Sequence, residues 1–138
     1  MERYLTSIQC AGLIVLKNRK LLLAFSKNKN AFYLPGGKVD ADETSLQALQ
    51  REIKEELNID LEENDLQYYY HIQAPAFGEN NLLMKQDCFI CDLKHQPVPG
   101  NEIGGIEYFD EQTYRLQEHV VPGVITAFER LRLDDLVD

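Results

Sequence analysis

A stripe of leucine and isoleucine at spacings of three and four residues predicts an amphipathic helix in the middle of the chain. Its apolar positions are Leu46, Leu49, Ile53 and Leu57. Thr44 and Gln47 match a capping box, so we expect the helix to begin at Ser45. Asn58 tolerates the left-handed backbone conformation, and we expect the helix to end there.

Most other hydrophobic residues fall in short β-branched or aromatic runs, which predict strands. Residues 8–16 and 20–25 flank an Asn18-Arg19 turn and predict a hairpin. Further strands are predicted at residues 66–73, 82–93 and 106–109. Polar or glycine-rich connections separate these strands, and one of them contains the central helix.

The last third of the chain adds a second long helix and a flexible connection. Residues 120–133 predict a helix with Pro122 in its first turn and one apolar face. Asp110 is expected to cap a short helix over residues 111–116, whereas the prolines and glycines of residues 95–105 indicate the most flexible segment. Strands mixed with two main helices predict a layered α/β sandwich, and the pattern alone leaves its topology open.

The polar edge of the central helix carries three glutamates. Glu52, Glu55 and Glu56 fall within an arc of about 100° beside the apolar stripe. The like charges of Glu52 and Glu56, four residues apart, destabilise a helix by a few tenths of a kcal/mol unless a cation offsets them. Oxygen ligands of this kind suit Mg²⁺ or Mn²⁺. An arbitrary acidic helix face is more often solvated surface, so the residues before the helix must decide.

A turn of small residues at 34–37 precedes the helix, and its paired glycines allow the backbone to approach a ligand closely. Counting from Gly37, Glu43 follows after five intervening residues and Arg51 after seven more, and the three glutamates complete the pattern. This spacing resembles the Nudix box, the signature of the Nudix hydrolases, over its whole 23-residue length. Asn58 is the one departure, because the family has glycine at that position.

The resemblance implies the Nudix fold, an α/β/α sandwich with a curved mixed β-sheet and a catalytic loop–helix–loop. We expect residues 1–138 to form a single Nudix hydrolase domain. The implied activity is divalent-metal-dependent cleavage of the pyrophosphate bond in a nucleoside diphosphate linked to another group. Nucleoside triphosphates, ADP-ribose, dinucleotide cofactors and dinucleoside polyphosphates all stay open as substrates. The implied cofactor is Mg²⁺ or Mn²⁺, which neutralises diphosphate charge and activates water.

Within the box, the resemblance implies metal ligands and a base. Glu52 and Glu56 are the expected core ligands of the metal, and the Gly37 carbonyl is a further oxygen. Glu55 is expected to be a ligand or a general base on the same edge, and a glutamate base contributes about 10²–10⁴-fold to a rate. The residues expected beside the substrate are Gly36, Gly37 and Lys38.

Three more charged residues complete the candidate site. Arg51 belongs to the catalytic set as an organiser, since its rigid fork can hold a box glutamate by a bidentate pair. Glu43 stays open between a partner that fixes the loop and a solvated residue. Many family members draw a further carboxylate from a late loop, which makes Glu102 the candidate second base or late metal ligand. Glu107 is its rival, although it lies inside a predicted strand.

Composition narrows the range of partners. A formal net charge of −9 argues against a nucleic acid polymer and against an anionic membrane surface. A small-molecule nucleotide remains the expected partner, because a bound divalent metal can reverse the local field. A homodimer stays open. The first residues indicate neither a signal peptide nor a membrane span, and an odd count of three cysteines favours the reducing cytoplasm.

Cys88 and Cys91 lie in a predicted strand, where positions three apart face opposite sides, so zinc is not expected. Aromatic residues that could stack on a nucleobase are mostly expected in the core or the sheets. They are Phe32, Tyr33, Phe77 and residues 68–70.

Two alternatives of a different class stay open. The first is a non-catalytic Nudix-fold module that senses or regulates through a nucleotide. Such modules commonly lose box carboxylates or carry a DNA-binding domain, whereas this chain keeps all three glutamates. The second is a Nudix-fold isomerase of prenyl diphosphates, which ranks last because no cysteine lies near the box.

Overall fold

A computed structural model describes residues 6–138. The strands are β1 (Thr6–Ile14), β2 (Leu16–Lys17), β3 (Lys20–Ser26), β4 (Ala31–Tyr33), β5 (Gly36–Lys38), β6 (Gln67–Pro75), β7 (Leu82–Ile90) and β8 (Ile103–Phe109). The helices are α1 (Ser45–Leu57), α2 (Glu111–Tyr114) and α3 (Pro122–Leu133), and a 3₁₀ turn spans Glu63–Asp65. The expectation that the chain begins without a signal peptide rests partly on residues 1–5, which lie outside the described residues.

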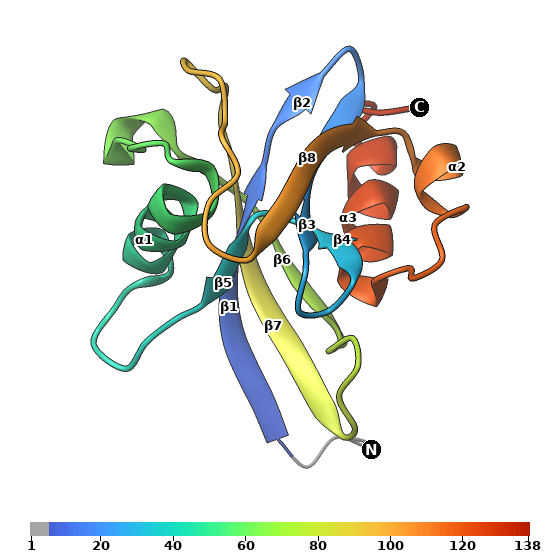
Figure 1. The fold of residues 1–138 in the computed structure, drawn as a ribbon, viewed down its shortest axis with the longest axis horizontal. Helices are drawn as coiled ribbons and strands as arrows, with labels where there is room; N and C mark the ends of the chain where they lie inside the picture. Colours follow the sequence, from blue (N-terminus) through green and yellow to red (C-terminus); the bar gives the residue numbers. More distant parts are fainter. Residues whose placement is uncertain (1–5) are drawn as a thin grey trace.

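Two four-stranded sheets form the middle of the molecule. The first has the order β5-β1-β7-β6, in which β1 and β7 are parallel and the outer pairs are antiparallel. The second joins β2, β3 and β4 and adds β8 beside β3, with all pairs antiparallel. Helix α1 lies on one side of these sheets and α3 on the other (Figure 1). This arrangement confirms the predicted α/β/α layers and places the mixed strand pairing in the first sheet.

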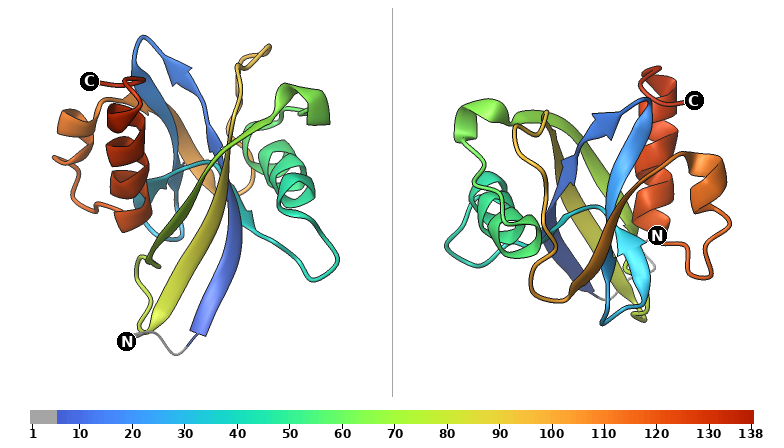
Figure 2. Two further views of the ribbon diagram at one scale, coloured as in Figure 1. Left: turned by 180° about the vertical axis from the view of Figure 1, so that it is seen from behind. Right: turned by 45° about the horizontal axis from the view of Figure 1, so that its top comes forward.

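Both faces of the central strands are buried, because each face meets a different helix. On β1, Ala11 and Leu13 belong to the apolar cluster that includes the buried side of α1. Ile14 belongs to the other cluster, which includes the buried side of α3. Figure 2 shows the two helices separated by the sheets from two further directions. A continuous apolar run is therefore required in the second half of β1, where every residue is buried, since alternation would leave one face polar.

The ends of α1 agree with the prediction residue by residue. The Thr44 hydroxyl accepts from the Gln47 N–H at 3.1 Å, and Gln47 Oε1 accepts from the Thr44 N–H at 3.0 Å. Asn58 closes the other end in the left-handed conformation, with φ 58° and ψ 38°. Between these caps the helix buries Ala48, Leu49, Ile53 and Leu57. A fully buried leucine or isoleucine stabilises the fold by about 1.5–3 kcal/mol, so this face holds the helix on the sheet.

Two glycine-rich segments differ from the prediction. The expected tight turn at 34–37 instead leads into strand β5, in which Gly36 and Gly37 pair with Gly12 and Ala11 of β1. A Cβ on Gly36 would lie 2.0 Å from the Ala11 carbonyl oxygen, so only glycine permits this pairing. Strand β8 begins at Ile103 rather than at residue 106, which places two glycines inside a strand instead of a flexible loop.

The remaining predictions vary in their outcome. Helix α2 ends at Tyr114, earlier than expected, and α3 begins at Pro122 with Val121 as its N-cap. Strand β7 ends at Ile90 rather than at residue 93, so Cys88 lies in the strand and Cys91 just beyond it. The two cysteines belong to different apolar clusters, which agrees with the expectation that they face opposite sides. Within residues 6–138, none of the helices has the length and apolar character needed to cross a membrane.

Candidate active site

The polar edge of α1 faces strand β5 at close range. A Cβ added to Gly37 would lie 2.5 Å from Cδ of Glu52, so the glutamate occupies the space that any other residue would fill. Glu56 Oε1 accepts a hydrogen bond from the Gly36 N–H at 3.0 Å. The pairing of β5 with β1 therefore brings two box glutamates against two adjacent glycines.

Arg51 organises the loop before α1. Its Nε and Nη2 atoms bind the two carboxylate oxygens of Glu43, each at 2.8 Å. Its Nη1 donates to Glu52 Oε1 at 2.8 Å, and Nη2 also donates to the Lys38 carbonyl at 3.1 Å. The bidentate pair thus involves Glu43, while Glu52 is held by a single hydrogen bond. Glu43, whose role the sequence left open, fixes the loop, and Arg51 lowers its pKa to about 2.

A cleft of about 550 Å³ opens beside these residues. The residues of the predicted site that line it are Gly36, Gly37, Lys38, Glu52, Glu56 and Glu102. Arg51 and Glu55 are not part of this lining. Glu55 is 44% exposed, with its Oε1 atom 3.9 Å from Nη1 of Arg51. The structure therefore brings three of the predicted carboxylates to one cleft and leaves Glu55 on the adjoining surface of α1.

Burial and the repulsion of neighbouring carboxylates raise the pKa values of Glu52 and Glu56 in the cleft. Burial raises the pKa of Glu56 to about 8, and the charges of Glu52, Glu102 and Glu55 act in the same direction. The Gly36 N–H opposes this increase by stabilising the ionised form. Burial also raises the pKa of Glu52, although Arg51 counteracts it. A nearby cation would favour the charged form of both carboxylates.

The donor set suits a hard divalent cation, since carboxylate oxygens and a backbone carbonyl are the ligands that Mg²⁺ and Mn²⁺ prefer. Within residues 6–138, no three histidine, cysteine or acidic side chains are already arranged as a group that could hold a metal ion. Mg²⁺ usually keeps several waters and is held by one or two carboxylates together with substrate phosphates. Glu52 and Glu56 with the Gly37 carbonyl would fit such an ion.

Glu102 reaches the cleft from the loop before β8. Its carbonyl accepts from the Lys27 N–H at 3.0 Å, and its carboxylate accepts from the Asn28 side-chain amide. Its rival Glu107 lies on β8, paired with Leu23, and is exposed outside the cleft. Of the two late carboxylates, the fold therefore brings Glu102 to the box glutamates.

The other end of the cleft is apolar and aromatic. The rings of Tyr33 and Phe77 meet edge to face, with centroids 6.2 Å apart. Met84 and Val121 continue this wall, and Gln86, only 7% exposed, lies in the lining. Sequence reasoning missed Gln86, because a glutamine within a polar stretch of strand carries no local signal of burial in a cleft.

The other aromatic candidates lie elsewhere. Phe32 packs between Phe25 and Phe109, with ring centroids 5.1 and 4.9 Å away. Tyr68 is 54% exposed and meets the ring of Phe89 edge to face. Of the aromatic residues singled out in the sequence, Tyr33 and Phe77 are the ones that line the cleft.

A polar cluster that the sequence did not predict anchors the first turn of α1. The Ser45 hydroxyl donates to Asp87 Oδ2 at 2.6 Å, and His71 Nδ1 lies 2.8 Å from Asp87 Oδ1. The first contact joins α1 to the first sheet, and the second links two strands of that sheet, since Asp87 is on β7 and His71 on β6. The helix is therefore fixed to the sheet at its N-terminal end by a hydrogen bond as well as by apolar packing.

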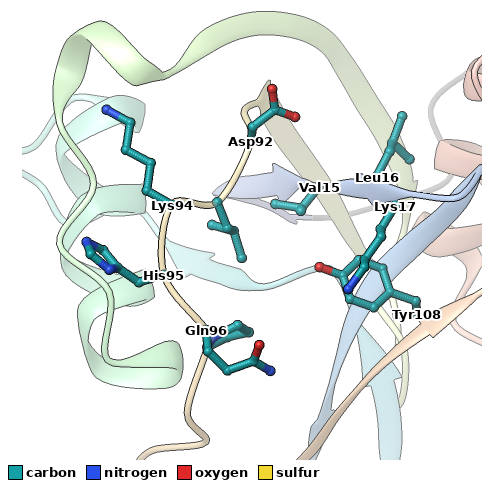
Figure 3. Close-up of a pocket in the computed structure, with 10 residues that line it drawn as sticks. Val15, Leu16, Lys17, Asp92, Lys94, His95, Gln96 and Tyr108 are labelled. Carbon is teal, nitrogen blue, oxygen red and sulfur yellow. The ribbon is translucent and has the colours of Figure 1, made fainter.

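A second hollow of about 370 Å³ lies between β2 and the segment after β7 (Figure 3). Lys17 lies over the Tyr108 ring, with Nζ 5.8 Å from its centroid. The Lys94 amine pairs with Asp65 at 3.1 Å and points away from Tyr108 in Figure 3. Asp92 is the one carboxylate in this lining, so the hollow lacks the acidic cluster of the larger cleft.

The fold and the cleft define an α/β protein whose capped helix presents glutamates to a glycine-lined strand. The NUDIX domain family matches residues 7–128, and the chain belongs to this family. No curated protein matches the sequence. The family match, together with Nudix hydrolases among the solved structures of the same fold, supports a pyrophosphohydrolase.

Solved structures share the fold along nearly the whole chain. The MutT NUDIX hydrolase from Burkholderia pseudomallei has a TM-score of 0.74 and 21% identity over 91% of this chain and 98% of that one. The C. elegans Ap4A hydrolase has a TM-score of 0.65 and 20% identity over 94% and 97%. The bifunctional NMN adenylyltransferase/ADP ribose pyrophosphatase from Francisella tularensis, solved with AMP and a Mn ion, has a TM-score of 0.68 and 18% identity over 94% and 42%.

Proposed function

We propose that this protein hydrolyses the pyrophosphate bond of a nucleoside diphosphate linked to another group, with Mg²⁺ or Mn²⁺ bound at the α1 glutamates. The observation that carries the proposal is the cleft in which Glu52, Glu56 and Glu102 face the backbone of Gly36 and Gly37. Substrates of the nucleoside triphosphate, ADP-ribose and dinucleotide types all fit this class. The named activities of the Ap4A hydrolase and the ADP ribose pyrophosphatase support the choice of a nucleotide.

Each charged residue has a distinct proposed role. Glu52 and Glu56 hold the cation with the Gly37 carbonyl, and Glu55 is a further ligand or base at the edge of the site. The bound cation would neutralise diphosphate charge and activate water. Glu102 is the second base or late ligand, since it lines the same cleft from the loop before β8. Arg51 keeps Glu52 and the loop in place.

The rest of the cleft suits the two ends of a nucleotide. The backbone of Gly36 and Gly37 and the ammonium of Lys38 line the acidic end, where the phosphates would lie. Tyr33 and Phe77 offer aromatic surface at the other end for a nucleobase. The Gln86 amide can both donate and accept hydrogen bonds, which suits the edge of a base. A mostly apolar pocket with a few polar groups is typical of small-molecule sites.

The proposal extends to the organisation of the protein. Both apolar clusters take residues from elements throughout the described chain, which supports one catalytic domain. The net charge of −9 favours a small nucleotide over a nucleic acid polymer as the partner. A cytoplasmic location and the open question of a homodimer stay predictions from the sequence.

Chromatographic detection of the two phosphorylated products from a panel of nucleoside diphosphate derivatives, with and without Mg²⁺ or Mn²⁺, tests the function. Glu52→Gln and Glu56→Gln should each reduce metal-dependent turnover by about 10²-fold or more, because ligands and bases of this kind contribute on that scale. Glu107→Gln is the matched control, since this glutamate is exposed outside the cleft. Silence across the panel in the presence of bound metal would overturn the proposal. Tight nucleotide binding that Glu52→Gln leaves unchanged would then favour a sensor.

A further inference from the structure

Asn58 stands where the Nudix box has glycine, and it does two separate things. Its backbone adopts φ 58° and ψ 38°, and its N–H donates to the Lys54 carbonyl at 3.2 Å, which closes the end of α1. A glycine would serve this first purpose at least as well. In addition, the Asn58 side-chain amide donates to the Val98 carbonyl at 2.7 Å, which a glycine could not do.

The Val98 carbonyl belongs to the late loop, which we define as residues 97–102. The backbone of this loop runs alongside the last turn of α1 (Figure 1). The Val98 N–H donates to the Leu57 carbonyl and the Gly100 N–H to the Glu56 carbonyl, each at 2.9 Å. These bonds satisfy carbonyls that the end of a helix leaves without partners inside the helix. Prolines and glycines suggested the most flexible segment, yet this part is hydrogen-bonded to α1.

The late loop comes so near to α1 that a side chain is excluded at one position. A Cβ on Gly100 would lie 2.4 Å from the Glu55 carbonyl oxygen and 3.1 Å from Nδ2 of Asn58. Beyond Gly100, its carbonyl accepts from the Ile103 N–H at 3.0 Å, which closes a turn around Glu102. The position of Glu102 is therefore set by how closely the loop docks on α1.

Two anchors hold Glu102 from opposite sides. On one side Lys27 and Asn28 contact its carbonyl and its carboxylate. On the other side the late loop ties it to the end of α1, whose last turn includes Glu56. Both carboxylates line the same cleft, so a movement of the loop away from α1 would separate them. The Asn58 amide is the side-chain contact that opposes this movement.

We infer that Asn58 is a positioning residue, whose side-chain amide docks the late loop on α1 and thereby fixes Glu102 relative to Glu56. This inference rests on the proposed function of the cleft, in which Glu102 is a base or a ligand. Asn58 acts on the reaction only through Glu102. The departure from the family motif therefore gives this chain an additional link between the box and its late carboxylate.

The test compares Asn58→Gly and Asn58→Asp with the wild type by hydrogen exchange of the Val98 and Gly100 amides. Glycine keeps the left-handed cap and loses the side chain, while aspartate keeps the shape and replaces the donor with an acceptor. Loss of one such hydrogen bond should accelerate exchange at both amides by roughly three- to tenfold in either variant. The melting temperature of Asn58→Gly should not decrease, because glycine favours this backbone conformation.

Kinetics then connect the loop to Glu102. In the wild-type background, Asn58→Gly should lower kcat by roughly three- to tenfold with little change in the KM for the nucleotide. In a Glu102→Gln background the same substitution should have no further effect, because its target is already lost. An equal loss in both backgrounds would overturn the inference.

Unchanged exchange at Val98 and Gly100 in both Asn58 variants would also overturn the inference. If the wild type hydrolyses nothing on the panel, the proposed function and the role of Glu102 fail together. The exchange measurement would then still decide whether Asn58 docks the loop, because it requires no turnover. The two failures can therefore be distinguished.

Discussion

Among single residues, Glu56 couples the chemistry of the cleft to its stability. Its pKa increases from 4.5 to about 8 on folding, so between these values the folded state binds more protons than the unfolded state. Stability must then decrease as the pH increases through this interval. In EDTA we expect the free energy of unfolding to decrease from about pH 5 to about pH 8, and Glu56→Gln to weaken this dependence. Urea unfolding at several pH values measures it.

The control for Glu56 is Glu107→Gln, which removes an exposed glutamate outside the cleft and should keep the wild-type slope. The pKa of Glu43 shifts in the opposite direction to that of Glu56, so its effect on stability changes with pH in the opposite sense. Its pKa decreases to about 2 on folding, so its contribution is present above pH 4.5 and is lost as the pH falls toward 2. A Glu56→Gln variant with the full wild-type slope between about pH 5 and 8 would contradict the assignment to Glu56.

Arg51 shows why a guanidinium cannot be replaced by another cation here. It contacts Glu43 through two nitrogens and Glu52 through a third, a geometry that the single ammonium of lysine cannot reproduce. We expect Arg51→Lys to lower kcat by about tenfold while the protein stays folded. Arg130→Lys is the control, because Arg130 lies on α3, outside the cleft lining, and pairs with Asp134 just after that helix. Equal kcat values for the two variants would show that the fork is not needed.

At the scale of elements, α1 depends on its first cap. The Thr44 hydroxyl and the Gln47 side chain each satisfy one backbone N–H of the first turn. Thr44→Ala should lower the free energy of unfolding by about 1 kcal/mol, the usual value of such a cap. Thr44→Ser keeps the hydroxyl and should stay near the wild type. Denaturant unfolding measures both, and a Thr44→Ala variant as stable as Thr44→Ser would argue against the cap.

The late loop can be tested with a matched pair of glycines. A Cβ at Gly100 would collide with the Glu55 carbonyl at 2.4 Å, whereas a Cβ at Gly105 would meet nothing within 4 Å. We expect Gly100→Ala to lower kcat by about tenfold or more, because the loop must move away from α1 and take Glu102 with it. Gly105→Ala should leave kcat within about twofold of the wild type. Equal activities would show that loop docking does not limit turnover.

Local sequence determined α1 completely and the late loop hardly at all. The caps of α1 and its apolar stripe are contacts within a few residues, so spacing alone predicts them. By contrast, Gly100 is fixed by a backbone carbonyl more than forty positions earlier in the chain. Strand β5 was missed for the same reason, since its glycines indicate a turn until their partners on β1 are known. A glycine in the sequence indicates that another part of the chain comes close to its backbone, but it does not tell which part.

On the scale of the whole molecule, the cleft depends on both layers of the fold. Its acidic end is made by α1, β5 and the late loop, while its apolar end uses β4, β7 and the start of α3. The motif predicted the first end, because the box is continuous in sequence. The second end, with Tyr33 on β4 and Met84 and Gln86 on β7, comes from two strands and the start of α3, and could not be predicted from any one of these elements.

Because the net charge is −9, a divalent cation can stabilise this protein both by binding at the cleft and by screening repulsion across its acidic surface. A cation that binds only the folded state stabilises it by about 2.7 kcal/mol at a hundred times its Kd. For a chain of this size we expect Mg²⁺ or Mn²⁺ to raise Tm by roughly 5–10 °C. The same cation could also act by screening the self-repulsion of an acidic protein, so a rise in Tm alone would not locate it.

Two comparisons separate specific binding from screening. NaCl at matched ionic strength should reproduce the screening part and leave a remainder that belongs to the divalent ion. That remainder should disappear in the Glu52→Gln/Glu56→Gln double variant. It should persist in Glu107→Gln, which removes one negative charge but leaves the cleft intact. A remainder of the same size in all three proteins would place the cation elsewhere on the acidic surface. The α1 glutamates would then not be the metal ligands that the proposed function requires.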